Sequence, residues 1–194
     1  MTLANQLTVL RIVLIPIFVL LLVYDLRISA LVIFLLTCLS DLLDGYIART
    51  WRQQTTLGTF LDPIADKLLM VTTFATLALL KALPMSLTIL LIARDVGLSL
   101  WVGFVFLTTG RRLSEPTLLG RAAMFGQMST VVSALFFHVF EGWPFFDTLR
   151  PFILMPVFVA TALLAVAAGT HYIIRLASLL YKVEEPLGRR MPVQ

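Results

Sequence analysis

The sequence predicts an all-α, polytopic membrane protein with six transmembrane helices and both termini in the cytoplasm. Hydrophobic residues make up 59% of the chain and charged residues 13%, whereas soluble domains contain roughly a half and a quarter. Apolar runs long enough to cross a bilayer recur along all 194 residues. Basic residues gather in the breaks on one side of these runs. A water-soluble enzyme and a disordered chain are both excluded.

Six apolar runs define the predicted spans, and charged or turn-forming residues separate them. The runs cover residues 7–24, 28–49, 60–81, 85–109, 117–140 and 152–180. None of the breaks is long enough to be a linker between domains. We therefore expect one catalytic domain over residues 1–183 and a mobile cytoplasmic tail over residues 184–194, where Pro186 and Pro192 lie.

The orientation follows from the basic residues in the short breaks. Three basic residues, Arg27, Lys81 and Arg150, lie on the side opposite to the N-terminus. Nine lie on the same side as the N-terminus, namely Arg49, Arg52, Arg111, Arg112, Arg121, Arg175, Lys182, Arg189 and Arg190. This asymmetry places both termini and the break from Arg49 to Gln54 in the cytoplasm. The net charge of +4 is explained by such loops and by anionic lipid headgroups, so we expect no nucleic acid partner.

Four aspartates flank the second break. Asp41 and Asp44 lie near the end of one predicted helix, and Asp62 and Asp66 lie near the start of the next. Residues three or four apart share a helix face, and the short break makes the two helices antiparallel neighbours. The four carboxylates are therefore expected to converge at the cytoplasmic boundary of the membrane.

Four converging carboxylates repel one another and need cations. Carboxylate oxygens without His or Cys suit Mg²⁺ or Mn²⁺, and four acids are enough for two ions that clamp a phosphate. Solvation at the interface, or pairing with Arg49 and Lys67, is the alternative. The small residues Gly45, Ala48 and Gly58 leave room for a flat ligand or for close helix packing.

These residues carry a resemblance to a known family. The pattern Asp41-x-x-Asp44-Gly45-x-x-Ala48-Arg49, eight residues, Gly58-x-x-x-Asp62-x-x-x-Asp66 resembles the full signature of the CDP-alcohol phosphatidyltransferases. The resemblance implies a six-helix membrane core, commonly a homodimer, with the site open to the cytoplasm. It implies transfer of a phosphatidyl group from CDP-diacylglycerol to an alcohol, with release of CMP.

The resemblance also implies roles for individual residues. Two divalent ions would be held by the four aspartates, with Asp66 also the catalytic base. The CDP-diacylglycerol site would include Asn5, Thr8, Gly45, Ala48, Arg49, Thr55 and Gly58. The alternative role for Asn5 and Thr8 is capping of the first helix. The alternative for Arg49 is a snorkelling side chain at the membrane interface.

The N-terminal half resembles the branch of phosphatidylglycerophosphate synthases and cardiolipin synthases. We expect glycerol 3-phosphate as the acceptor, with phosphatidylglycerol as the alternative because Pro116 to Arg121 resembles the cardiolipin synthases. An anionic acceptor needs further cations, for which Arg11, Arg94 and Arg121 are the candidates. Arg94 and Asp95 form the alternative of a simple buried ion pair.

A small ion-binding transporter is the alternative from another class, although the chain has no internal repeat and its acids lie towards one side. His138 and His171 lie far along the chain from the aspartates and are expected to pack within the helices. The aromatic residues between Phe136 and Phe146 are expected to anchor the non-cytoplasmic interface. These features predict a multi-pass protein, with a bacterial inner membrane as the expected location.

Overall fold

The computed structural model consists of helices, turns and loops. It describes the backbone of residues 3–50, 56–109 and 117–188, and the side chains of residues 9–40, 65–105, 107–108, 117–175 and 177. The helices are α1 (Leu3–Val23), α2 (Arg27–Thr50), α3 (Thr56–Leu79), α4 (Met85–Thr109), α5 (Leu118–Val139) and α6 (Pro144–Gly188). Each corresponds to one predicted apolar run, so the all-α fold with six helices is confirmed.

Three helices in the described part of the chain are long and apolar enough to cross a membrane. They cover Met85–Val105, Leu118–Val139 and Pro144–Arg175, and shorter apolar helical segments cover Val9–Val23 and Arg27–Ser40. The structure thus contains several apolar helices, and six spans with cytoplasmic termini stay a prediction.

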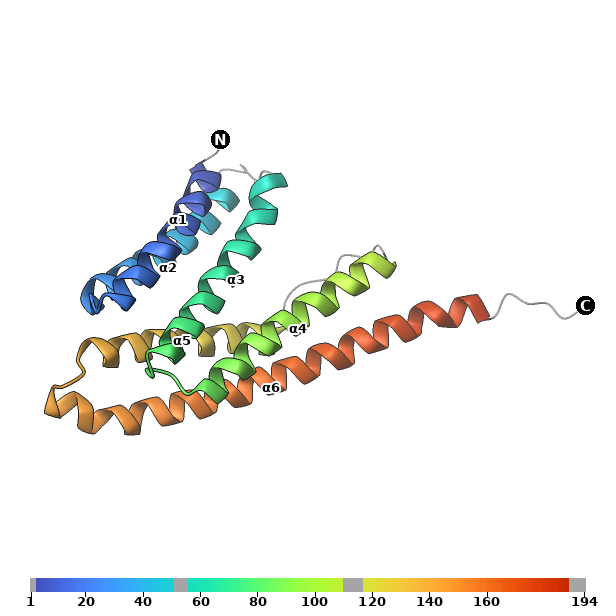
Figure 1. Ribbon diagram of the computed structural model, residues 1–194. Helices are drawn as coiled ribbons and strands as arrows, with labels where there is room; N and C mark the ends of the chain where they lie inside the picture. The colour runs from blue at the N-terminus through green and yellow to red at the C-terminus, as the bar shows by residue number, and fades with distance from the viewer. Residues whose placement is uncertain (1–2, 51–55, 110–116, 189–194) are drawn as a thin grey trace, which may run out of the picture. The chain divides into compact units, whose positions relative to one another are not determined.

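The contacts within the chain divide it into two compact units. The first contains residues 1–88 and 131–154, and the second contains residues 89–130 and 155–194. In the first unit α1 lies against both α2 and α3 (Figure 1). Its interior includes Phe18 and Phe34, whose ring centroids are 5.7 Å apart, together with Phe74 and Leu77.

Two of the turns are closed by residues in the left-handed backbone conformation. Asp25 has a φ of 59° after α1, and Lys81 has a φ of 58° after α3. In each turn an amide reaches back five residues to a carbonyl, from Leu26 to Leu21 at 2.8 Å and from Ala82 to Leu77 at 2.9 Å. These bonds satisfy the last carbonyls of the helices and reverse the chain direction.

Helices α5 and α6 begin with recognisable capping residues. The Thr117 hydroxyl accepts a hydrogen bond from the Gly120 amide at 3.1 Å, as expected of an N-cap. Helix α6 begins at Pro144, where the missing amide proton costs nothing because first-turn amides lack helical partners. The Asp147 carboxylate accepts a bond from the Gly142 amide at 3.2 Å, which fixes the turn before the helix.

The predicted bounds of the last helix were wrong at both ends. We expected a span from 152 to 180, whereas α6 extends from Pro144 to Gly188. The break was expected to end at Pro151, but membrane helices tolerate proline when neighbouring groups satisfy the freed carbonyls. Residues 184–188, which we assigned to the tail, are helical, because the good helix formers Leu, Lys and Glu precede Pro186.

Candidate functional site

The predicted metal-binding motif lies on the last turns of α2 and the first turns of α3. Asp41, Asp44 and Arg49 fall within α2, and Asp62 and Asp66 fall within α3. Both halves of the motif are helical, as the spacing requires for residues three and four apart to share a face. Of these side chains, only that of Asp66 belongs to the described part of the structure.

Other predicted site residues also lie outside the described side chains or backbone. The convergence of the four carboxylates therefore stays a prediction, as do the roles of the CDP-binding residues. The residues concerned are Asn5, Thr8, Asp41, Asp44, Gly45, Ala48, Arg49, Thr55, Gly58 and Asp62. Among the described side chains there is no group of three or more His, Cys, Asp and Glu residues that could hold a metal ion, and three of the four predicted ligands lie outside them.

Asp66 is joined to α1 by an ion pair with Arg11. The Arg11 Nη1 atom donates to Asp66 Oδ1 at 2.5 Å. The Arg11 side chain is 0% exposed, whereas that of Asp66 is 49% exposed. The cation thus lies beneath a carboxylate that remains half-open at the surface. A charge-assisted bond of this kind is stronger and more directional than a neutral one.

The chemistry of Asp66 fits a ligand for a hard divalent cation. Its carboxylate offers oxygen atoms, which Mg²⁺ and Mn²⁺ prefer, and part of it is accessible from outside. The Arg11 bond occupies one side of Oδ1, and each carboxylate oxygen carries more than one acceptor site. The pairing with Arg11 is therefore compatible with a second contact to a metal or to a substrate proton.

Arg94 forms an ion pair within the second unit. Its Nη1 atom donates to Asp95 Oδ1 at 2.6 Å, and the two side chains are 13% and 20% exposed. Gln127 Nε2 donates to the other oxygen of Asp95 at 2.9 Å, which ties α4 to α5. The structure therefore contains the ion pair of the predicted alternative, although it is only partly buried, and the acceptor role of Arg94 stays a prediction.

Arg94 also lines an apolar groove between α4 and α6. The groove has a volume of about 510 Å³, and glycine and alanine residues of both helices are among those that line it. A Cβ atom added to Gly97 would meet nothing within 4 Å. The lining residues are Leu90, Ala93, Arg94, Gly97, Leu98, Trp101, Ala165, Val166, Gly169, Thr170 and Ile173.

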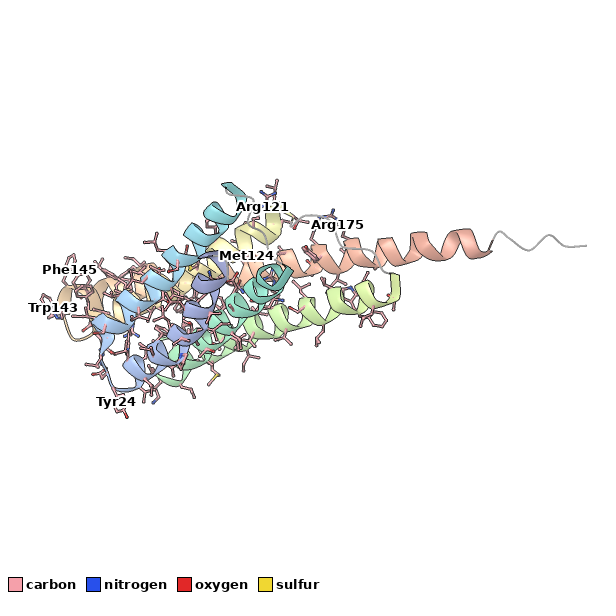
Figure 2. The ribbon with its side chains drawn as sticks, turned by 90° about the horizontal axis from the view of Figure 1, so that it is seen from above. Tyr24, Arg121, Met124, Trp143, Phe145 and Arg175 are labelled. Atoms are coloured by element: carbon pink, nitrogen blue, oxygen red, sulfur yellow. The ribbon has the colours of Figure 1, made fainter. Side chains whose placement is uncertain are left out.

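Arg121 lies in the first turn of α5 and is exposed (Figure 2). Its amide donates to the Thr117 carbonyl at 3.0 Å, which anchors the backbone while leaving the side chain at the surface. This exposure suits contact with a soluble anion better than the buried position of Arg11 does. The assignment of Arg121 to the acceptor stays a prediction.

A second polar cluster joins two turns of the first unit. Arg27 Nη1 donates to the His138 carbonyl and to Glu141 Oε2, both at 2.8 Å, and its Nε donates to Asp25 at 2.5 Å. The bond from Arg27 lowers the pKa of Asp25 below its ordinary value. Arg150 lies 3.5 Å from Glu141. These contacts connect the α1–α2 turn with the α5–α6 turn.

The prediction that both histidines pack inside the helices is correct only for His138. That side chain is buried, and its Nδ1 lies 3.3 Å from Glu141 Oε2. His171 is exposed on α6, so its predicted packing is wrong. In the predicted aromatic group, the rings of Phe140 and Phe146 stack with centroids 4.6 Å apart, and exposed Trp143 and Phe145 lie beside them (Figure 2).

Sequence reasoning missed three interhelical polar contacts in the second unit. Gln127 was not predicted to hold Asp95, and Thr130 was not predicted to donate to Thr161 at 2.9 Å. Thr161 in turn donates to the Gly126 carbonyl at 3.0 Å. The available signal was a buried amide within an otherwise apolar helix, because such a group needs a partner in the membrane.

Comparison with known proteins gives matches over most of the chain. The family described as CDP-alcohol phosphatidyltransferase matches residues 1–168. The probable phosphatidylglycerophosphate synthase of Mycobacterium tuberculosis is 34% identical over 179 residues, which are 89% of this chain and 80% of that protein.

Two further relatives match shorter stretches. The human cardiolipin synthase (CMP-forming) is 39% identical over 121 residues, which are 62% of this chain and 39% of that protein. The CDP-diacylglycerol–glycerol-3-phosphate 3-phosphatidyltransferase of Pseudomonas fluorescens is 49% identical over 72 residues, which are 36% of this chain and 37% of that protein.

Proposed function

The chain belongs to the CDP-alcohol phosphatidyltransferase family, and from this premise we propose that it transfers a phosphatidyl group from CDP-diacylglycerol to glycerol 3-phosphate. Membership makes it a transferase of phospholipid biosynthesis and an integral membrane protein with several apolar helices. The family implies CDP-diacylglycerol and an alcohol as substrates, and its members are generally metal-dependent. The proposal concerns the acceptor, the residues and the topology.

The proposed acceptor rests on one observation, the alignment with the mycobacterial protein. That protein carries the name of a probable phosphatidylglycerophosphate synthase, and the alignment covers 89% of this chain. The alternative acceptor is phosphatidylglycerol, favoured by the human cardiolipin synthase at 39% identity over 121 residues. The transporter alternative has no support, because the matching family consists of enzymes.

Asp41, Asp44, Asp62 and Asp66 are the proposed ligands of two divalent cations, Mg²⁺ or Mn²⁺. Bound there, such ions would neutralise the charge of the pyrophosphate and of the departing CMP. The support from the structure is the half-exposed carboxylate of Asp66 and the helical register of both motif halves. Gly45, Ala48 and Gly58 are proposed to leave room for the cytidine.

The proposed reaction is a single displacement. Asp66 accepts the proton of the acceptor hydroxyl, and the hydroxyl oxygen forms a bond to the phosphorus that carries diacylglycerol. The bond between that phosphorus and the CMP phosphate oxygen breaks, and CMP leaves with the electron pair. Positioning of the two substrates by the protein contributes most of the rate.

The proposed topology has six spans, with both termini and the motif facing the cytoplasm, where CDP-diacylglycerol headgroups and magnesium are available. Residues 1–183 are proposed to form one catalytic domain, and two copies of the chain are proposed to form a homodimer. The bias of basic residues toward one set of loops supports the orientation.

The deciding experiment is a parallel assay of CMP release. Purified protein is incubated with CDP-diacylglycerol and Mg²⁺, and with either glycerol 3-phosphate or phosphatidylglycerol. We expect turnover with glycerol 3-phosphate, loss of activity with EDTA and recovery with Mg²⁺ or Mn²⁺. Turnover with phosphatidylglycerol alone would replace the proposed acceptor, and full activity after thorough chelation would contradict the metal assignment.

A further inference from the structure

The burial of Arg11 separates it from the other candidate acceptor residues. It lies in the middle of α1, its side chain is 0% exposed, and its guanidinium contacts Asp66 on α3. A side chain without exposed surface has no atom to offer to a soluble phosphate ester. The buried position of Arg11 therefore favours a role in which it acts on Asp66 and does not bind the acceptor.

We propose that Arg11 is a positioning residue, which holds the Asp66 carboxylate in its reactive orientation from a helix that carries none of the four motif aspartates. The inference rests on the role of Asp66 under the proposed function. The bond from Nη1 to Oδ1, 2.5 Å long, fixes one carboxylate oxygen against the interior and leaves the side chain 49% exposed.

The physical reason is the contrast between the two partners. A charge buried within an apolar helix bundle needs a counter-charge, so Arg11 has a strong preference for one carboxylate position. A half-exposed aspartate on its own would populate several rotamers. Partners that orient metal-binding or catalytic carboxylates typically change activity by about 10- to 100-fold when removed.

This inference gives helix α1 a role in the proposed active site. In the described part of the chain, α1 packs against both α2 and α3, the two helices that carry the aspartates. Arg11 makes that packing chemically specific, because a shift of α1 along α3 would move the guanidinium away from Oδ1. The position of the proposed base would thus depend on α1 as well as on α3.

The test compares Arg11→Met and Arg11→Lys with wild type in the assay with CDP-diacylglycerol and acceptor. We expect Arg11→Met to lower kcat by about 10- to 100-fold, with the KM for the acceptor almost unchanged. Lysine should restore part of the loss, because it keeps the charge but lacks the planar fork. Each kcat is divided by the amount of folded protein in the sample, which is determined from the amplitude of its thermal unfolding transition.

Arg27 provides the matched control, because it is also a helix-borne arginine paired with carboxylates but lies in the turn cluster. Arg27→Met and Arg27→Lys should retain the wild-type kcat per folded protein. Loss of kcat in these variants as large as in Arg11→Met would show a general effect of losing ion pairs and would overturn the inference.

The remaining outcomes separate this inference from the proposed function. Wild-type kcat in Arg11→Met, or a raised acceptor KM with an unchanged kcat, would overturn the positioning role. If Arg11→Met does not fold, Arg11→Lys decides, and a wild-type kcat there would overturn it as well. Full activity of Asp66→Asn would instead contradict the proposed function, whatever the result at Arg11.

Discussion

Each of the two units contains an arginine paired with an aspartate, fully buried in the first unit and largely buried in the second, and the two aspartates differ in exposure. Arg11 and Asp66 lie 55 residues apart and join α1 to α3, and the aspartate stays 49% exposed. Arg94 and Asp95 are neighbours on α4, and the aspartate is only 20% exposed. Gln127 occupies its second oxygen. About half of the Asp66 side chain is thus accessible from outside, whereas both oxygens of Asp95 accept hydrogen bonds within the second unit.

The largest expected effect comes from Asp66→Asn, which tests whether Asp66, the aspartate paired with Arg11, is the catalytic base. An amide cannot accept the acceptor proton, so kcat should fall by about 10²- to 10⁴-fold. Binding of CDP-diacylglycerol should remain measurable by equilibrium dialysis of the labelled substrate, because the side chain keeps its size. Wild-type CMP release would remove Asp66 as the base.

Asp95→Asn tests whether the ion pair between Arg94 and Asp95 stabilises the fold. It leaves the Arg94 guanidinium buried without a counter-charge, which costs about 3–5 kcal/mol for a buried pair. A lower Tm in detergent is therefore expected. Asp25→Asn is the control, because the Asp25–Arg27 pair is exposed and such pairs contribute little. Equal Tm losses in both variants would remove the contrast between buried and exposed pairs.

Arg94→Ala and Arg121→Ala distinguish the two remaining acceptor candidates. A lost charge-assisted bond of about 1.5–3 kcal/mol raises the acceptor KM by roughly 10- to 100-fold. We expect this rise in both variants, with an additional fall in Tm only for Arg94→Ala. An unchanged acceptor KM in Arg94→Ala would leave the pair with Asp95 as a purely structural contact.

Gly126→Ala tests an uncharged contact within the second unit, the one between Gly126 on α5 and Thr161 on α6. The new Cβ would lie 3.1 Å from Thr161 Oγ1, the atom that donates to the Gly126 carbonyl. Crowding of this kind costs about 1–3 kcal/mol, whereas alanine gains about 1 kcal/mol over glycine in any helix, so Tm should fall relative to the control. Gly103→Ala serves as the control, because its Cβ would meet nothing within 4 Å. An unaltered Tm in Gly126→Ala would show that α6 yields at this point.

The helices themselves were predictable because apolar periodicity and length act within one segment. All six were expected, and the start of α4 at Met85 was correct to the residue. The start of α6 was not, because a proline at residue 151 looks like a helix end when its neighbours are unknown. Proline at residue 144, by contrast, is typical of a first helical position.

The site was predictable only to the extent that it is local. The spacing of the aspartates predicts shared faces on two adjacent helices, and both segments are helical. The partner of Asp66 was not predictable, because nothing in the spacing says which face of α1 meets α3. Arg11 was therefore assigned to the acceptor, and the buried contact between Asp95 and Gln127 was missed for the same reason.

The turn after α3 offers a practical route to a more robust sample for structural work. Lys81 has a φ of 58°, a conformation that costs an ordinary L-residue about 1 kcal/mol and costs glycine nothing. Its side chain is exposed, and the turn is closed by the backbone bond from Ala82 to Leu77. Lys81→Gly should therefore raise Tm without affecting turnover, and a lower Tm would show that the lysine side chain stabilises the turn. Such a variant would survive longer in detergent, which is where purified membrane enzymes are most often lost.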